Sequence, residues 1–368
     1  MDTEMLGQRI ARARDAVGMT QDGLAKSVGI DRSAISRLEN GERKLNVPEL
    51  VEIASALGRP LAYFVADPVP SVVSRRSDSA HAHATTGLLD VELEQFASDV
   101  RSLLATGVLP MGRRAALSLP QNHAEAERAA EVVRSWAALD SGPIDDLGRT
   151  CERLGLYTFA ASLGESGADG GCVEVESGVG VVGVTVVNGD VPAGRRRMTL
   201  AHELGHWVFG DAYDSDASVD GERMINSFAI HFLAPRAGVA RVWNEHRDLV
   251  ERDRALTVGA VFRLSWSAAV SQLKNLGLID FDGHRVLGGR EPRQGDYLRL
   301  GLAWVEEFAA PYLSPGFTAA VLNGYLDGRL TAERSLELLR GTLVADELPV
   351  RDGGSVEDLR RSFAGHDD

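Results

Sequence analysis

The sequence predicts a multidomain fold, with an all-α domain at the N-terminus, an α+β domain in the middle and a helical region at the C-terminus. Residues 1–66 carry apolar residues at helical spacing and no strand pattern. Three β-patterned segments then fall between residues 157 and 187, directly before a long helical pattern. Only helical patterns follow residue 290. A chain of 368 residues is long enough for two or three such domains.

Composition places the chain among globular proteins of a reducing compartment. It is 44% hydrophobic and 25% charged, and no apolar run approaches the ~20 residues that a membrane span needs. No signal-peptide pattern opens the sequence. The two cysteines, Cys151 and Cys172, lack metal-type spacing. We therefore expect a cytoplasmic protein without a disulfide framework.

The net charge of −14 argues against nucleic-acid binding by most of the chain, but the charge is unevenly spread. Residues 1–66 carry 9 Lys and Arg against 9 Asp and Glu, whereas residues 67–368 carry 30 against 44. Any DNA binding should therefore lie at the N-terminus and depend on local placement of charge. A neutral domain of this size predicts modest affinity for a single copy, so we expect dimeric binding.

Residues 1–66 predict five short helices. Turn and capping residues separate them, among them Gly18, Thr20, Asp31 and Gly41. The second and third helices, 21–28 and 32–39, are joined by a tight turn, which is the pattern of a helix-turn-helix. A helical bundle for protein contacts is the alternative.

The motif Gly-Met-Thr-Gln-x-x-Leu-Ala-x-x-x-Gly-Ile at 18–30, followed by Ile-Ser-Arg-Leu-Glu-Asn-Gly at 35–41, resembles the XRE family of lambda repressor/Cro-like helix-turn-helix domains. The resemblance implies double-stranded operator DNA as partner, with the third helix in the major groove. The implied base contacts are Arg32, Ser33, Ser36 and Arg37. The implied phosphate contacts are Gln21, Asn40, Arg43 and Lys44.

Two connecting regions follow this domain. Residues 67–87 are rich in Ser, Ala and Pro and poor in large apolar residues, which predicts a flexible linker. Residues 88–120 contain a bridging helix over 88–106 with one acidic face. That helix either packs between domains or pairs with a second copy.

Residues 121–290 contain the motif that carries chemistry, His-Glu-Leu-Gly-His at 202–206. On a helix His202 and His206 lie about 40° apart, so both imidazoles can bind one metal ion. Glu203 points away from direct ligation but can reach a water on the metal, as in zinc peptidases. The strand at 180–187 leads into this helix and predicts the edge to which a peptide substrate adds.

A third ligand is needed after His206. The acidic candidates are Asp211, Asp214, Asp216, Asp220 and Glu222. Glu222 is the best placed because it begins a helix over 222–233, and Asn226 on the same face can hydrogen-bond a ligating imidazole. His231 lies about 180° round that helix from Glu222, so we expect it at the surface or in packing rather than on the metal.

The segments Arg-x-Thr-Leu-Ala-His-Glu-Leu-Gly-His at 197–206 and Glu-x-x-x-Asn-x-Phe-Ala-x-x-x-Leu-x-Pro at 222–235 resemble the ImmA/IrrE family of zinc-dependent metallopeptidases. The resemblance implies an α+β zincin-like domain that binds Zn²⁺. It implies Glu203 as general base and cleavage of an XRE-type repressor, or of the chain itself, after stress or another signal. A transcription factor whose peptidase-like domain senses or docks without cutting is the alternative.

The resemblance extends to residues 262–277, a helix, turn and helix capped by Ser265. We expect Gln272 and Lys274 on its exposed face and a packing or substrate-docking role. Residues 291–368 predict a helical region, with helices at 298–308, 317–326 and 331–339, for dimer contacts, regulation or partner binding.

Overall fold

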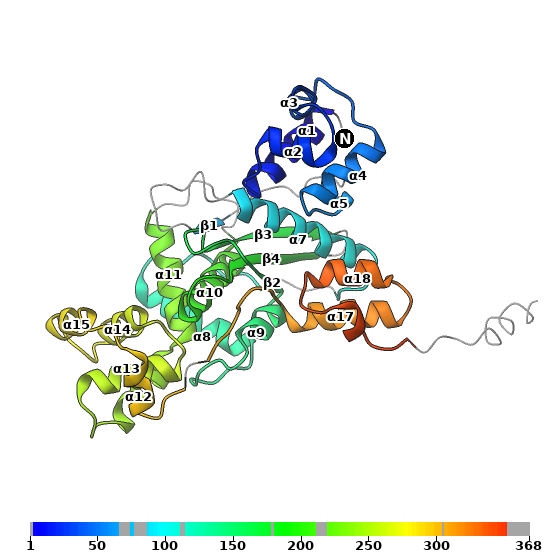
Figure 1. Ribbon diagram of the computed structural model, residues 1–368. Helices are drawn as coiled ribbons and strands as arrows, with labels where there is room; N and C mark the ends of the chain where they lie inside the picture. Colours follow the sequence, from blue (N-terminus) through cyan, green and yellow to red (C-terminus); the bar gives the residue numbers. More distant parts are fainter. Residues whose placement is uncertain are drawn as a thin grey trace, which may run out of the picture.

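The computed structural model describes residues 3–65, 74–76, 87–110, 115–177, 180–210, 219–303 and 305–351. The predicted flexible linker therefore lies outside the described residues, except for its strand at 74–76 and residue 87. Figure 1 shows a small helical domain standing on a layered α/β body, with a further group of helices at the opposite end.

Five helices form the N-terminal domain. They are α1 (Thr3–Ala16), α2 (Gln21–Val28), α3 (Arg32–Glu39), α4 (Val47–Ala56) and α5 (Leu61–Val65). The side chains of Ile10, Leu24, Ile35 and Phe64 are completely buried and form its core. Thr20 caps α2 by accepting a hydrogen bond from the Gly23 amide, as its sequence position predicts.

A five-stranded sheet forms the centre of the body. Its strands are β1 (Ser74–Arg76), β2 (Leu156–Ala161), β3 (Gly170–Ser177), β4 (Gly180–Asn188) and β5 (Tyr312–Leu313), in the order β1-β3-β4-β2-β5. The β2–β4 pair is parallel and the other pairs are antiparallel. The prediction that β4 is the substrate edge is wrong, because β4 is hydrogen-bonded to β3 on one side and to β2 on the other.

One face of the sheet is covered by α7 (Gly87–Ala105), α17 (Pro315–Leu326) and α18 (Ala332–Leu339). Phe317 and Leu338 share a buried cluster with Phe96 of α7 and with Phe159 and Val184 of the sheet. A domain boundary at residue 290 would therefore divide elements that share one core. Helices α17 and α18 of the C-terminal region pack on the sheet and on α7.

The other face carries the long helix α10 (Ala193–Phe209), and helices from before and after it pack around it. Before it lie α8 (His123–Trp136) and α9 (Leu147–Arg153). After it come α11 (Val219–Leu233), α12 (Arg236–Glu245), α13 (Glu251–Val261), α14 (Trp266–Asn275), α15 (Phe281–Gly288) and α16 (Gln294–Arg299). A 3-10 turn, Ala345–Glu347, follows α18.

Strand alternation explains how the sheet serves both layers. Tyr157 and Phe159 of β2 belong to the cluster under α7, whereas Leu156 and Ala160 belong to the cluster around α10. Successive side chains of a strand point to opposite faces, so a strand buried on both sides needs apolar residues at both phases.

The predicted helix at 298–308 is wrong. Helix α16 ends at Arg299, and the described residues after it, up to Tyr312, contain no helix or strand. The segment is irregular, and its Glu306 and Glu307 pair with Arg196 and Arg197 near the start of α10. Such long-range ion pairs leave no trace in helical periodicity.

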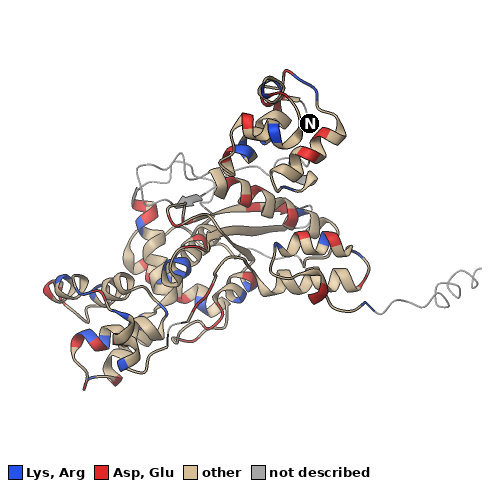
Figure 2. Ribbon diagram, in the orientation of Figure 1, with Lys and Arg blue, Asp and Glu red and all other residues tan. Residues whose placement is uncertain are grey.

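Helix α7 joins the N-terminal domain to the body. Its Val91 side chain is buried in the cluster of the N-terminal domain. Arg9 bonds Glu94 at 2.9 Å, and Arg59 bonds Glu92 at 2.7 Å. Figure 2 shows Asp and Glu along this helix, which the sequence predicted to be acidic on one face. Of the two predicted roles, the structure shows packing between domains.

Candidate functional site

The motif helix α10 begins at Ala193 and is buried along almost its whole length. His202 and His206 are each 1% exposed and Glu203 is 0% exposed. Trp207 anchors the end of the helix by donating its indole N–H to the Leu154 carbonyl at 2.8 Å. The candidate side chains therefore lie on a buried helix, as a preorganised site requires.

A glycine inside the motif lets the next helix approach. A Cβ at Gly205 would lie 2.9 Å from the Ile225 side chain and 3.1 Å from Phe228, both on α11. Any larger residue would push α11 away from α10. This close packing brings Glu222 of α11 to the two histidines.

Three potential ligand side chains converge at this point. The Nε2 atoms of His202 and His206 lie 3.0 Å apart. A carboxylate oxygen of Glu222 lies 3.3 Å from the first and the other oxygen 3.5 Å from the second. The three residues form a group in which the ligand atoms all lie within 4.8 Å of one another.

Donors of a tetrahedral metal centre with bonds of about 2.0–2.2 Å lie roughly 3.3–3.6 Å apart. The distances from Glu222 to the two histidines fall in this range, and the two Nε2 atoms lie slightly closer, at 3.0 Å. Two buried imidazoles and one carboxylate also form a common donor set of three-ligand metal centres that keep one position open. The side chain of Glu222 is 39% exposed, so the site opens to the surface on the α11 side.

Asn226 supports this arrangement. Its Oδ1 lies 3.2 Å from Nδ1 of His202, and its side-chain amide donates to the Glu222 carbonyl at 2.9 Å. A hydrogen bond to Nδ1 leaves Nε2 as the nitrogen that can bind a metal. Of the other acidic candidates, Asp220 is paired with Arg223 at an exposed position, and Asp211, Asp214 and Asp216 lie outside the described residues.

One expectation about neighbouring polar residues is wrong, because Gln272 is fully buried rather than on an exposed face. His231 was expected at the surface or in packing, and at 5% exposure it lies in packing. The Gln272 amide donates to the Ala234 carbonyl at 2.8 Å and lies 3.2 Å from Nδ1 of His231. The reason is that α14 packs on α11, so its polar Gln272 becomes an internal link. Lys274 lies over the Phe281 ring, 5.2 Å from its centroid.

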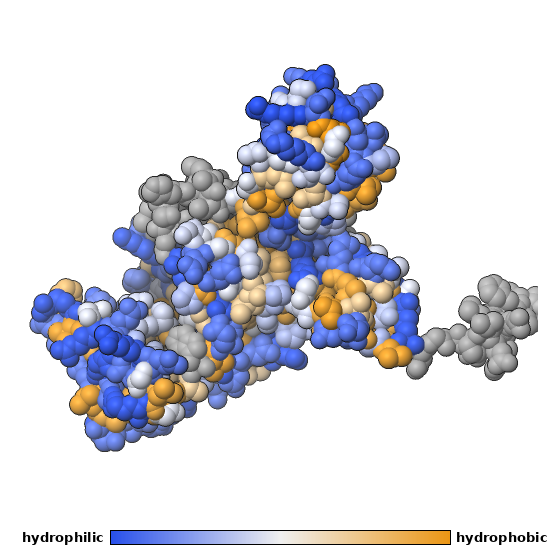
Figure 3. Space-filling model, in the orientation of Figure 1, coloured by the Kyte–Doolittle hydropathy of each residue, from blue (hydrophilic) through white to orange (hydrophobic). Residues whose placement is uncertain are grey.

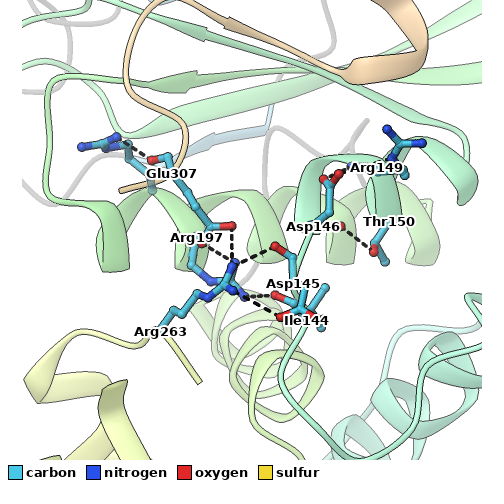
Figure 4. A network of polar contacts seen from close by, with 9 residues as sticks. Ile144, Asp145, Asp146, Arg149, Thr150, Arg197, Arg263 and Glu307 are labelled. Atoms are coloured by element: carbon cyan, nitrogen blue, oxygen red, sulfur yellow. Dashed lines mark hydrogen bonds and ion pairs between the residues drawn. The ribbon is translucent and has the colours of Figure 1, made fainter. Parts of the chain in front are cut away.

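A polar network fixes the first half of α10 (Figure 4). The guanidinium of Arg197 bonds Glu307 at 2.6 Å and the Ile144 carbonyl at 3.1 Å. Arg263 bonds the same carboxylate at 3.0 Å and the Asp145 carbonyl at 2.8 Å. Burial lowers the pKa of Arg197, and Glu307 opposes that effect. The network ties the motif helix to three distant segments.

A cavity of about 1440 Å³ lies between α10, α11, α14 and the segment 291–303. Asn226, Arg223 and Met198 belong to its wall. The three candidate ligands do not line it, but Asn226 contacts both His202 and Glu222 and so connects the cavity with them. Trp266 and Tyr297 contribute aromatic surface. The cavity is larger than the ~300–1,000 Å³ of typical small-molecule sites, and this size suits a polypeptide segment.

The second candidate surface is α3 of the N-terminal domain, which lies on the side away from α7 (Figure 1). Arg32, Ser33 and Arg37 are exposed on it, and Ser36 is half-buried. Figure 3 shows hydrophilic residues over this outer part of the domain. The domain therefore contacts α7 with one face, and α3 lies on another face that is accessible to a partner.

The four residues expected to contact phosphates occupy different environments. Gln21 donates its amide to Glu39 at 2.8 Å, within a cluster in which Arg14 bonds the same carboxylate at 2.6 Å. Hydrogen bonding to Glu39 raises the pKa of Arg14. Gln21 therefore also has a structural contact. Asn40 and Lys44 are exposed, whereas Arg43 is paired with Glu49 at 2.5 Å.

Sequence reasoning missed several parts of the site. It did not anticipate that His123 of α8 meets Ser227 of α11 at 2.9 Å in the cavity wall. It also missed the cavity and the strands β1 and β5. Strand pairing and cavities arise from contacts between distant segments, so local pattern carries no signal for them.

Comparison with protein families separates the two regions. Residues 10–64 match the family described as helix-turn-helix, and residues 151–274 match the IrrE N-terminal-like domain. The chain joins a helix-turn-helix domain to an IrrE N-terminal-like domain. The family resemblances predicted from the two motifs are thereby confirmed.

Two curated proteins that are similar to parts of this chain are described as transcriptional regulators. An uncharacterized transcriptional regulator in the ATPase CF(0) region of Rhodospirillum rubrum is 34% identical over 62 residues, 17% of this chain and 57% of that protein. The HTH-type transcriptional regulator PrpR of Mycobacterium tuberculosis is 31% identical over 94 residues, 24% of this chain and 19% of that protein. The chain thus spans about half of the first relative and a fifth of the second.

The crystal structure of ComR from Streptococcus suis covers 92% of this chain and 94% of its own, at 12% identity and a TM-score of 0.17. That likeness is too weak to indicate function. Among the described helices of the chain, none has the length and apolarity needed to cross a bilayer.

Proposed function

We propose that this protein is a DNA-binding regulator of transcription whose IrrE-like domain is a zinc-dependent endopeptidase. Its substrate is an XRE-type repressor, or the chain itself, and cleavage changes transcription at the site where the helix-turn-helix domain binds. The observation that carries the proposal is the convergence of His202, His206 and Glu222 at separations of 3.0 to 3.5 Å.

The ligand set supports zinc. His202, His206 and Glu222 would hold the ion, and the contact of Asn226 with Nδ1 of His202 would orient that ring. When bound, Zn²⁺ would lower the pKa of a coordinated water and polarise the scissile carbonyl.

Glu203 supplies the acid–base chemistry of this proposal. It follows His202 directly in the buried helix α10, and its own side chain is fully buried. A carboxylate there takes the proton of the attacking water and returns it to the leaving amine. The cavity beside Asn226 and Met198 receives the substrate chain.

In this proposal the helix-turn-helix domain binds the chain to a specific operator sequence. Arg32, Ser33, Ser36 and Arg37 of α3 contact base edges in the proposed complex, and Gln21, Asn40, Arg43 and Lys44 contact phosphates. The domain has no net charge, which favours binding as a homodimer to two half-sites.

Metal analysis combined with a cleavage assay tests the proposal. Purified chain is assayed for zinc and incubated with XRE-type repressors encoded near its own gene, as wild type and as Glu203→Gln. The expected result is stoichiometric zinc in both and a discrete cut only with the wild type. Bound zinc without any Glu203-dependent cut would favour a docking module that does not cleave.

A further inference from the structure

The outer edge of β3 is the part of the sheet that a peptide can reach beside the candidate metal site. Its inner edge is paired with β4 along its whole length. A Cβ at Gly170 would lie 2.8 Å from the Thr199 side chain of α10. Thr199 stands three residues before His202, so the first residues of β3 lie against the turn of α10 that leads into the motif.

The chain itself pairs with this edge. Ser74, Arg75 and Arg76 of β1 are the antiparallel partners of Cys172, Gly171 and Gly170. Figure 1 shows β1 at the outer side of β3. A strand added to a sheet edge gains its affinity from backbone hydrogen bonds and therefore tolerates many sequences.

The direction of β1 connects the edge with the cavity. In the antiparallel register β1 runs from Cys172 toward Gly170, which follows Asp169. Asp169 is ion-paired at 2.6 Å with Arg195, and Arg195 belongs to the cavity wall. A peptide with the polarity of β1 thus leads from the edge of β3 toward the cavity next to Asn226.

We propose that the edge of β3 at Gly170–Cys172 is the peptide-binding edge of the metal site and that β1 is its resident occupant. The linker acts as a tethered competitor, and a substrate in trans has to displace it. This inference rests on the proposed function, because a substrate binds at this edge only if the domain is a peptidase. The pairing of β1 with β3 can be measured without any peptidase activity.

Tethering makes the competition strong. Only eight residues separate Val65, the end of α5, from Ser74, and ten separate Arg76 from Gly87 at the start of α7. Both flanking helices belong to folded parts of the molecule. A segment held by short connections competes at an effective concentration on the order of millimolar, so its removal should strengthen binding in trans about tenfold or more.

Occupancy in the free protein is tested by a cross-link. Directly opposed residues of an antiparallel pair have Cα atoms about 4.5–5.5 Å apart, within the range that a disulfide bridges. Ser74 is the register partner of Cys172, whose thiol is buried, so Ser74→Cys places a second cysteine directly opposite it. In a Cys151→Ser background, mild oxidation should join residues 74 and 172, as read by peptide mass spectrometry.

Arg75→Cys is the matched control, because its register partner is Gly171. It should cross-link to Cys172 at least several-fold more slowly. Equal yields for the two variants, or no cross-link with Ser74→Cys, would overturn the proposal that β1 occupies this edge. Neither measurement needs zinc or peptidase activity.

Competition is tested with a probe peptide that has the sequence of residues 70–80. Its binding to the full chain in a Glu203→Gln background is followed by fluorescence anisotropy. Replacing all three residues of β1 by proline removes their backbone donors, and the affinity for the peptide should rise about tenfold. Replacing them by alanine keeps the donors and should leave the affinity within twofold of the parent chain.

An unchanged affinity in the proline variant would overturn the competition. The proposed function fails differently: the cross-link forms and the peptide binds, but the proline variant with Glu203 intact cleaves nothing. With both proposals correct, that variant cleaves a repressor in trans about tenfold faster than the parent chain.

Discussion

The two domains display their functional residues in opposite ways. In the helix-turn-helix domain the candidate DNA contacts Arg32 and Arg37 are exposed, while the polar pair that holds the helices together, Arg14 and Glu39, is buried. In the IrrE-like domain the functional candidates His202 and Glu203 are themselves buried. Substitutions at Arg32 or Arg37 should therefore change DNA binding without changing stability, whereas His202 and Glu203 belong to the packed interior of the second domain.

The connection between the domains is also polar. Glu92 of α7 bonds Arg59 of the N-terminal domain and Arg340 near the C-terminus, at 2.7 and 3.2 Å. Arg340 also bonds Asp99 at 2.6 Å and lies over the Phe159 ring. The helix-turn-helix domain is thus held on α7 by ion pairs around a small apolar contact at Val91. Interfaces of this kind permit relative motion more readily than large apolar ones.

Glu39→Ala should produce the largest effect. Removing Glu39 leaves the guanidinium of Arg14 buried without its main partner, which costs about 3–5 kcal/mol in other proteins. Hydrogen exchange should report this loss in α1, α2 and α3 while α10 and α11 keep their protection. DNA binding should be lost together with the fold of the domain.

Glu42→Ala is the control for this variant, since Glu42 is exposed in the loop after α3. It should change the free energy of opening by less than about 0.5 kcal/mol. Equal effects of the two substitutions would contradict the structural role given to the Arg14–Glu39 pair.

Glu222→Ala tests the proposed ligand set of the IrrE-like domain. Losing one of three ligands should weaken zinc binding by more than about 100-fold, because even partners behind the ligands contribute 10- to 100-fold. Competition with a chelator measures the affinity. Asp220→Ala, on the same turn of α11 but exposed, should leave it unchanged. Equal zinc affinity in Glu222→Ala and wild type would remove Glu222 from the ligand set.

Arg37→Ala should weaken operator binding by about 1–3 kcal/mol without altering stability, because the side chain is exposed on α3. Electrophoretic mobility shifts with the promoter region of the chain's own gene measure the affinity, and thermal unfolding measures the stability. Unchanged binding would contradict the assignment of α3 as the recognition helix. A loss of stability would contradict the separation of function from folding in this domain.

His231 should give the smallest effect, a dependence of stability on pH. Burial lowers the pKa of His231 below 6.5, Glu127 opposes the shift, and Arg236 and His123 reinforce it. The unfolded chain then binds a proton that the folded chain does not. Stability should be fully present above pH 6.5 and fall as the pH drops from there toward the folded pKa. A His231→Gln variant should lose this part of the dependence in thermal unfolding. An identical pH profile would contradict it.

Much of the local structure could be predicted from the sequence. The helices of the N-terminal domain, the three strands before α10 and the α11 helix with Glu222 and Asn226 all follow from short-range periodicity and capping residues. The predicted ligands lie together because the geometry of two packed helices follows from small residues such as Gly205. Within this part of the molecule, local pattern and global fold agree.

The failures share one cause, which is contact between distant segments. The sequence could not show that β4 is central, because β2 and β3 flank it through pairings that periodicity does not encode. Gln272 looked exposed on its own helix and is buried because α11 packs on that face. Glu307 belonged to a helical pattern but lies in an irregular segment, where it binds the distant Arg197.

The central claim is that the α10–α11 site holds a metal and cuts a polypeptide chain. Its most direct test is mass spectrometry of zinc-loaded protein incubated with a neighbouring XRE-type repressor, for wild type and Glu203→Gln at equal zinc content. We expect a single cut with the wild type and a rate lower by about 10²–10⁴-fold with the variant. Equal cleavage by both proteins, or bound zinc with no cut in the repressor or in the chain itself, would contradict it.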